Sequence, residues 1–168
     1  MMMTLKTLAA ASALALLATI PAAAQQPAAA PPPPSYGSSM SLDQAKKAVA
    51  AAEAEANKNG WKMAISAVSI GGNLIHFTKI DDTQIASIQI SQHKAKAAAT
   101  FRRPTKAFQD GLSATPPNLF LLTLDGVIAS EGGIPIVMNG KIVGAIGCSG
   151  GTGAQDGQTC QAGVDALK

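Results

Sequence analysis

The chain has 168 residues, of which 47% are hydrophobic, 14% are charged and 4% are aromatic. This composition is typical of one globular domain and excludes a disordered chain, which lacks the apolar residues that form a core. The formal net charge of +3 and the few aromatic side chains argue against phosphate contacts or base stacking, so we expect no nucleic-acid partner.

The first 24 residues have the pattern of a secretory signal peptide. Lys6 precedes an apolar run from Leu8 to Ile20, and small residues at 22–24 form a cleavage site. The run is shorter than the roughly 20 residues that span a bilayer, so we expect cleavage rather than stable membrane insertion. A periplasmic or secreted protein is therefore predicted.

Residues 25–40 are predicted to form a linker rich in proline and alanine. Between Gln25 and Ser35 no side chain is suited to a core, and the proline run favours polyproline II. We expect an extended spacer, with a ligand for a proline-binding module as the alternative. The folded domain is then expected to cover residues 41–168.

Residues 42–59 are predicted to form the first helix of this domain. A capping box begins at Ser41, and Gly60 is a typical helix terminator. Residues 63–70 then alternate between two faces, and a Gly-Gly-Asn turn joins them to residues 74–78. This pattern predicts a β-hairpin.

A second helix is expected from a cap at Asp82 or Thr83 to Phe101, with Pro104 stopping it. Small residues allow close packing, and isoleucines are expected inside with them. The predicted buried residues are Ile85, Ile88, Ile90, Ala95, Ala97, Ala98 and Ala99.

A short helix over residues 105–110 and a strand over residues 119–124 are predicted next. The Asn139-Gly140 pair lies between two β-branched runs, residues 134–138 and 141–147. Asn-Gly is the preferred sequence of a type I′ turn, so a second hairpin is expected here.

A glycine-rich loop over residues 147–153 and a last helix over residues 155–168 complete the predicted elements. Adjacent hairpins favour an antiparallel sheet with helices packed on it. We therefore predict a single domain of the α+β class.

Cys148 and Cys160 are the only cysteines, and they are twelve positions apart. Export permits a disulfide, but the spacing differs from that of a C-x-x-C redox pair. A bridge and two separate buried thiols both remain open.

The sequence Gly147-Cys148-Ser149-Gly150-Gly151 fits the G-x-S-x-G pattern of a nucleophile elbow. Both histidines precede the serine, so no base follows it as the hydrolase order requires. We interpret the segment as a glycine-lined turn whose N–H groups suit an anionic or planar ligand.

His76 on a predicted strand and His93 on a predicted helix are candidate metal ligands, with a structural role as the alternative for each. A basic cluster follows His93. Its members are suited to carboxylates or to a solvated helix end: Lys94, Lys96, Arg102, Arg103 and Lys106.

Several motifs occur in an order typical of a known family. They are Gly71-Gly72-Asn73-Leu74-Ile75, Lys94-Ala95-Lys96-Ala97-Ala98, Gly132-Gly133-Ile134-Pro135-Ile136, the stretch G-K-I-V-G-A-I-G-C-S-G over residues 140–150, and Gln155-Asp156. Together they resemble the GlcG/HbpS haem-binding family, also called the haem-degrading domain, over residues 41–168.

The resemblance implies a profilin-like fold, a homo-oligomer and, in exported members, binding of haem and iron with a link to redox sensing. It also implies a threonine hydroxyl as iron ligand, for which Thr100 and Thr105 are the candidates. Gly157 and Cys160 depart from the acidic residue and the alanine of many members, which leaves room for a Cys148–Cys160 bridge.

We therefore expect an exported haem-binding protein, non-enzymatic or weakly reactive, that sequesters haem or iron or reports it to a membrane sensor. The expected cofactor-binding residues are His93, His76, Thr105, Thr100, Met138, Lys94, Arg102, Arg103, Gly147 and Gly150. The first alternative is an enzyme or accessory protein that binds a small anionic metabolite at the loop 147–153. The second is an oligomeric scaffold tethered by the proline-rich arm.

Overall fold

The computed structural model describes residues 31–168, and Pro32–Lys168 form one compact unit. The predicted signal peptide and residues 25–30 of the linker lie outside the described residues. Within the described part, the elements occur in the following order: α1 (Leu42–Lys58), β1 (Ala64–Val68), β2 (Leu74–Lys79), α2 (Ala86–Phe101), α3 (Lys106–Ser113), the 3-10 helix η1 (Leu119–Thr123), β3 (Gly133–Met138), β4 (Lys141–Ser149) and α4 (Gly153–Asp165).

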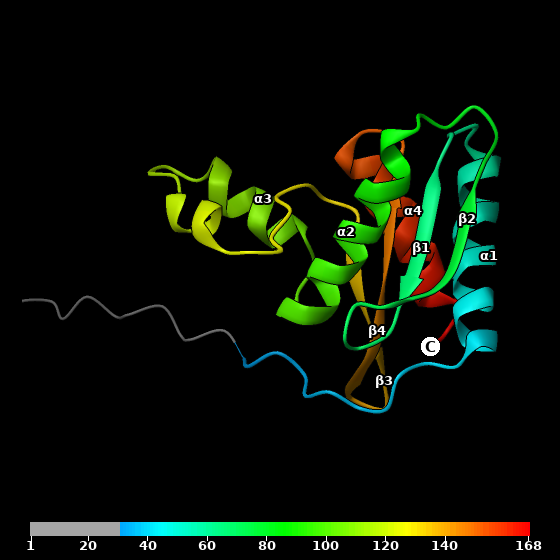
Figure 1. Cartoon of the computed structure of the whole chain (residues 1–168), viewed down its shortest axis with the longest axis horizontal. Coiled ribbons are helices and arrows are strands. Elements are labelled where there is room, and N and C mark those ends of the chain that lie inside the picture. The colour runs from blue at the N-terminus through cyan, green and yellow to red at the C-terminus, as the bar shows by residue number, and fades with distance from the viewer. Residues whose placement is uncertain (1–30) are drawn as a thin grey trace, which may run out of the picture. The chain divides into compact units, whose positions relative to one another are not determined.

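The four strands form one antiparallel sheet in the order β2-β1-β4-β3. Figure 1 shows α2 on one face of this sheet and α1 with α4 on the other. The α+β prediction with an antiparallel sheet flanked by helices is therefore confirmed.

The core consists of two apolar layers, because successive residues of a strand face opposite sides of the sheet. Ile65 of β1 and Ile146 of β4 pack with the residues of α1 and α4. Val68 and Ala145 instead pack against the alanines of α2. A disulfide between Cys148 and Cys160 joins β4 to α4 within the first layer, so the structure favours the bridge over two free thiols.

Two local predictions are confirmed by backbone geometry. The Ser41 side chain accepts a hydrogen bond from the Gln44 N–H, and the Gln44 side chain accepts one from the Ser41 N–H, as in a capping box. Asn139 and Gly140 have φ angles of 50° and 73°, the pair of positive values that a type I′ turn requires.

The predicted start of the second helix is wrong, because α2 begins at Ala86 and has no side-chain cap. Asp82 lies in the left-handed region with φ of 64°, and the Thr83 hydroxyl donates to the Ile80 carbonyl. Both residues therefore belong to a turn that follows β2. Ile85, predicted to be inside, is 83% exposed.

The alanines of α2 that were predicted to be inside, Ala95 and residues 97–99, are buried. The position of Gly147 on β4 explains why α2 needs small residues on the face that contacts the sheet. A Cβ atom at Gly147 would lie 2.1 Å from the Ser91 carbonyl oxygen of α2. The helix backbone thus approaches β4 too closely for isoleucine side chains to lie between them, and Ile88 and Ile90 are only half-buried.

The predicted strand over residues 119–124 is also wrong, because Leu119–Thr123 form the 3-10 helix η1. Part of the outer edge of β3 is not open to another strand, because Thr105 pairs with Gly133 and Pro135 has no N–H group. Three of its four apolar side chains are exposed to solvent: Leu119, Phe120 and Leu122.

The glycine-rich loop is shorter than predicted. Gly147–Ser149 continue β4, and α4 begins at Gly153, so only residues 150–152 connect the two elements.

Residues 35–40 contact the sheet, although their sequence pattern is that of a linker. The Ile142 N–H donates to the Ser35 carbonyl, the Gly37 N–H donates to the Ile142 carbonyl, and Met40 is buried. Backbone pairing of this kind needs no particular side-chain pattern. Among the described residues, no helix has the length and apolar character needed to cross a membrane.

Candidate functional site

Lys94 is buried inside the protein and is not placed to meet an external carboxylate. Its ammonium group donates to Asp156 Oδ2 at 2.7 Å and to the Glu131 carbonyl at 2.6 Å. Burial raises the pKa of Asp156, and the hydrogen bond and charge of Lys94 oppose this shift. The pair connects α2 to the start of α4.

Thr105 is also fully buried and engaged. Its hydroxyl accepts from the Gly133 N–H at 2.9 Å, and its own N–H donates to the Gly133 carbonyl at 2.9 Å. Thr105 therefore protects the outer edge of β3.

Gly147 and Gly150 serve close backbone packing. A Cβ atom at Gly150 would lie 1.9 Å from the Lys62 carbonyl oxygen, and Gly147 contacts the backbone of α2. Both glycines are thus explained by the fold without a ligand.

Four further predicted site residues, Arg102, Arg103, Met138 and His76, do not line the pocket that contains His93 and Thr100. Arg102 packs on the ring of Tyr36, with 5.6 Å between its Cζ atom and the ring centroid, and Arg103 lies 5.9 Å from the ring of Phe108. Met138 accepts a weak hydrogen bond from Gln44, and His76 is half-buried on β2.

His93 and Thr100 are brought together in one groove. The groove has a volume of about 430 Å³, within the range of small-ligand pockets. Residues of α2 line one side and the loop after η1 lines the other; we call this the His93 groove, and its residues are His93, Lys96, Thr100, Phe101, Asp125 and Gly126.

Helical spacing aligns the α2 side of this groove. His93, Lys96 and Thr100 are three and four positions apart, which places their side chains on one exposed face. The Lys96 stem packs on the β1–β2 turn, where a Cβ atom at Gly72 would lie 2.6 Å from Lys96 Cγ. The groove thus combines an exposed imidazole, an aromatic ring and an ammonium group whose alkyl stem is packed against the turn.

Phe101 and Asp125 are groove residues that the sequence pattern missed. Phe101 is predicted as the end of a helix and Asp125 follows a predicted strand, and neither is among the expected cofactor-binding residues. No local motif links the two positions, so only the fold reveals that they are neighbours.

The loop 150–152 does not offer free N–H groups to an anion. The Gly151 N–H donates to Asp156 Oδ1 at 3.0 Å, and the Thr152 N–H donates to Gln155 Oε1 at 2.9 Å. Side chains of the protein itself therefore occupy two of the N–H groups that an anion bound at this loop would use.

Ser149 lacks the partner of a nucleophile. Its hydroxyl donates to Ser87 Oγ at 3.1 Å, and both side chains are buried. Within residues 31–168, no group of three or more His, Cys, Asp or Glu side chains is placed to hold a metal ion.

Comparisons with known proteins agree with this fold. The sequence model described as "Haem degrading protein HbpS-like" matches residues 40–165. Protein GlcG of Escherichia coli K12 is 37% identical over 110 residues, which cover 66% of this chain and 81% of GlcG.

Two solved structures share the architecture. A double mutant of HbpS from Streptomyces reticuli has a TM-score of 0.71 at 28% identity, covering 84% of this chain and 99% of that chain. A complex of PduOC with haem has a TM-score of 0.71 at 22% identity, covering 77% of this chain and 96% of that chain. The second likeness supports the fold alone.

Proposed function

The chain belongs to the HbpS-like family of haem degrading proteins, and from this premise we propose that it binds haem in the His93 groove. The observation that carries the proposal is the exposed imidazole of His93 in a groove that also contains a cation and an aromatic ring. Imidazole is a common protein ligand of haem iron.

The other groove residues suit the remaining parts of haem. The Phe101 ring provides an apolar wall for the porphyrin, whose burial supplies most of the binding energy. The Lys96 ammonium is suited to a propionate. The Thr100 hydroxyl donates to the Lys96 carbonyl at 2.9 Å, which leaves its oxygen as a weak second ligand. Bound haem would supply redox-active iron to this surface.

Export is part of the same proposal. A signal peptide over residues 1–24 would direct the protein to the periplasm or the medium, where it would sequester haem or report it to a membrane sensor. The Ser149 hydroxyl donates to Ser87 and not to a base, which argues against hydrolysis at this serine.

A homo-oligomer is proposed on the basis of η1. Leu119, Phe120 and Leu122 are 62%, 63% and 69% exposed, and clustered apolar side chains of this kind mark interaction surfaces. Sedimentation velocity should show self-association that Phe120→Ser weakens. A monomeric wild-type protein at working concentrations would contradict this part of the proposal.

The haem site is tested by titrating haemin into wild type, His93→Ala and His76→Ala and following the Soret band. His76 is the matched control, because it is the other histidine and does not line the groove. We expect saturable binding in wild type and in His76→Ala, with affinity at least about tenfold weaker in His93→Ala.

Two outcomes would contradict the proposal. Unchanged affinity in His93→Ala would move the site away from this groove, and the absence of a saturable Soret shift in wild type would exclude haem binding. Circular dichroism of each variant excludes a general loss of structure as the cause.

A further inference from the structure

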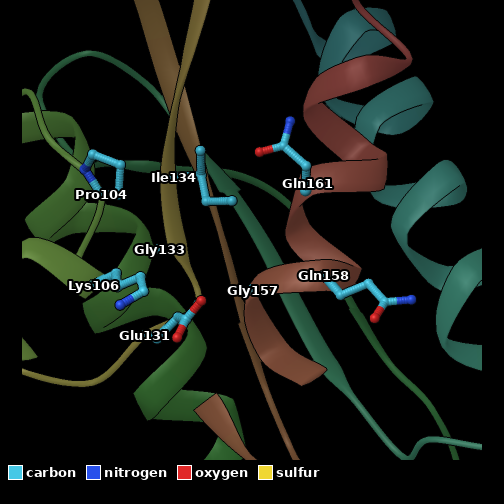
Figure 2. Close-up of a pocket in the computed structure, with 9 residues that line it drawn as sticks. Pro104, Lys106, Glu131, Gly133, Ile134, Gly157, Gln158 and Gln161 are labelled. Carbon is cyan, nitrogen blue, oxygen red and sulfur yellow. The ribbon is translucent and has the colours of Figure 1, made fainter. Parts of the chain in front are cut away.

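A second groove lies between the start of α3, the start of β3 and α4, away from His93. Figure 2 shows the residues around it, and its volume is about 340 Å³. Pro104 and Ile134 contribute apolar walls, and Gly132 and Gly133 bring the backbone to its surface. We call it the Glu131 groove.

Glu131 is held in place by both of its backbone groups. Its N–H donates to Gln109 Oε1 at 2.9 Å, and its carbonyl accepts from the buried Lys94 ammonium at 2.6 Å. The side chain therefore projects from a fixed backbone, which is the condition for a preorganised binding group.

Gly157 of α4 makes room for the Glu131 side chain. A Cβ atom at Gly157 would lie 2.6 Å from Glu131 Oε1 and 3.1 Å from its Cγ atom. The carboxylate thus lies directly against the helix surface, beside the cavity rather than in open solvent (Figure 2).

The Glu131 carboxylate has no hydrogen-bond or ion-pair partner among the described residues. The nearby Lys106 ammonium instead contacts both carboxylate oxygens of Asp110, at 2.7 and 2.8 Å. The hydrogen bond to Asp110, with the negative charges of Asp110 and Glu131, raises the pKa of Lys106. The ammonium group of Lys106 is thus shared between two carboxylates, of which it pairs directly only with Asp110, so these three groups carry one net negative charge.

The second polar group of the groove is also an acceptor. Gln161 uses its NH₂ group to donate to Asp165 Oδ1 at 2.9 Å, and Figure 2 shows its amide oxygen turned towards Ile134. Gln158 points away from the groove and donates to Glu55. A carboxylate and an amide oxygen thus face a mostly apolar cavity.

We propose that the Glu131 groove binds the ammonium group of a small aliphatic amine. An ammonium group carries three donors and no acceptor, which matches two acceptor groups and one net negative charge. The alkyl part of the ligand lies against Pro104 and Ile134. A carboxylate ligand fits poorly, because it would face Glu131 while Lys106 is engaged by Asp110.

The test is an NMR titration of ¹⁵N-labelled protein with n-butylamine at neutral pH. The neutral 1-butanol and the anionic butyrate serve as ligand controls of similar shape. We expect saturable shifts at the Gly133, Ile134 and Gly157 amides with butylamine alone. Glu131→Gln should weaken binding at least about tenfold, whereas Asp81→Asn, an exposed carboxylate elsewhere, should leave it unchanged.

A second variant blocks the space without changing the charge. Gly157→Ala places a methyl group where the Glu131 side chain lies, and we expect it to weaken butylamine binding as well. The proposal fails if butylamine gives no saturable shift, if Glu131→Gln binds as wild type does, or if butyrate binds more tightly than butylamine. Because the two grooves share no lining residue, we expect haemin affinity to be unchanged in all these variants, so the two sites are tested separately.

Discussion

Lys94 and Asp156 form an ion pair between α2 and α4 whose removal tests how the fold is held together. Their side chains are only 2% and 4% exposed, and 2.7 Å separates Nζ from Oδ2. Removing one partner of such a pair leaves an uncompensated buried charge, which typically costs about 3–5 kcal/mol. Lys94→Met should therefore lower the free energy of unfolding by roughly 3 kcal/mol or more.

The remaining contacts of Asp156 place the expected loss near the lower end of this range. The carboxylate of Lys94→Met would still accept from the Gly151 N–H, so it is not left without any donor. A loss of about 3 kcal/mol corresponds to a decrease in Tm of roughly 10 °C for a domain of this size.

The assay is guanidinium chloride unfolding at neutral pH, with Lys96→Met as the matched control. Lys96 lies two positions away on the exposed side of α2, and its substitution should change stability by less than about 0.5 kcal/mol. The double variant Lys94→Met/Asp156→Asn removes both charges and keeps an acceptor for Gly151. It should be more stable than Lys94→Met alone.

Two results would refute this reasoning. One is a loss below about 1 kcal/mol in Lys94→Met, which would mean that the pair is exposed to water in solution. The other is a double variant no more stable than Lys94→Met, which would mean that lost packing rather than the uncompensated charge is the cause.

Three further predictions concern pH, close packing and the disulfide. Because burial raises the pKa of Asp156, the folded state binds its proton more tightly. The free energy of unfolding of wild type, relative to that of Asp156→Asn, should therefore fall as the pH rises from 3.8 through the folded pKa. A rise of this relative stability over the same pH range would contradict the prediction. Gly147→Ala should lower the free energy of unfolding in urea by about 1–3 kcal/mol, because the new Cβ would meet the α2 backbone. Gly60→Ala is the control and should cost about 1 kcal/mol, because this site has open space and only its positive φ disfavours alanine. Reducing Cys148–Cys160 should lower stability by roughly 3 kcal/mol in calorimetry, and no decrease in Tm would show that the bridge does not form in solution.

Elements set by local chemistry could be predicted from the sequence. The Asn139-Gly140 turn requires two positive φ angles, and the capping box at Ser41 satisfies helix N–H groups through its own side chains. Neither feature depends on a distant part of the chain, which is why the turn and the cap were each predicted at the correct position.

Elements set by distant contacts could not be predicted in this way. The apolar run at Leu119 matches a strand by composition, but a strand needs a free edge to pair with, and Thr105 and Pro135 restrict the outer edge of β3. The isoleucines of α2 were expected inside because apolar residues usually are. The close approach of Gly147 to α2 reserves that space for alanine.

Within α2, the roles of neighbouring basic residues also depend on contacts that the local sequence does not show. Lys94 and Lys96 belong to one basic cluster in the sequence, but each residue of a helix is rotated by about 100° from the one before it. Lys94 consequently points into the core, where Asp156 neutralises it, while His93 and Lys96 remain on the exposed face. The buried and the exposed members of a basic cluster on a helix therefore have to be distinguished before any ligand is assigned to the cluster. In α2, this distinction separates Lys94, whose loss should destabilise the fold, from Lys96, whose loss should leave stability nearly unchanged.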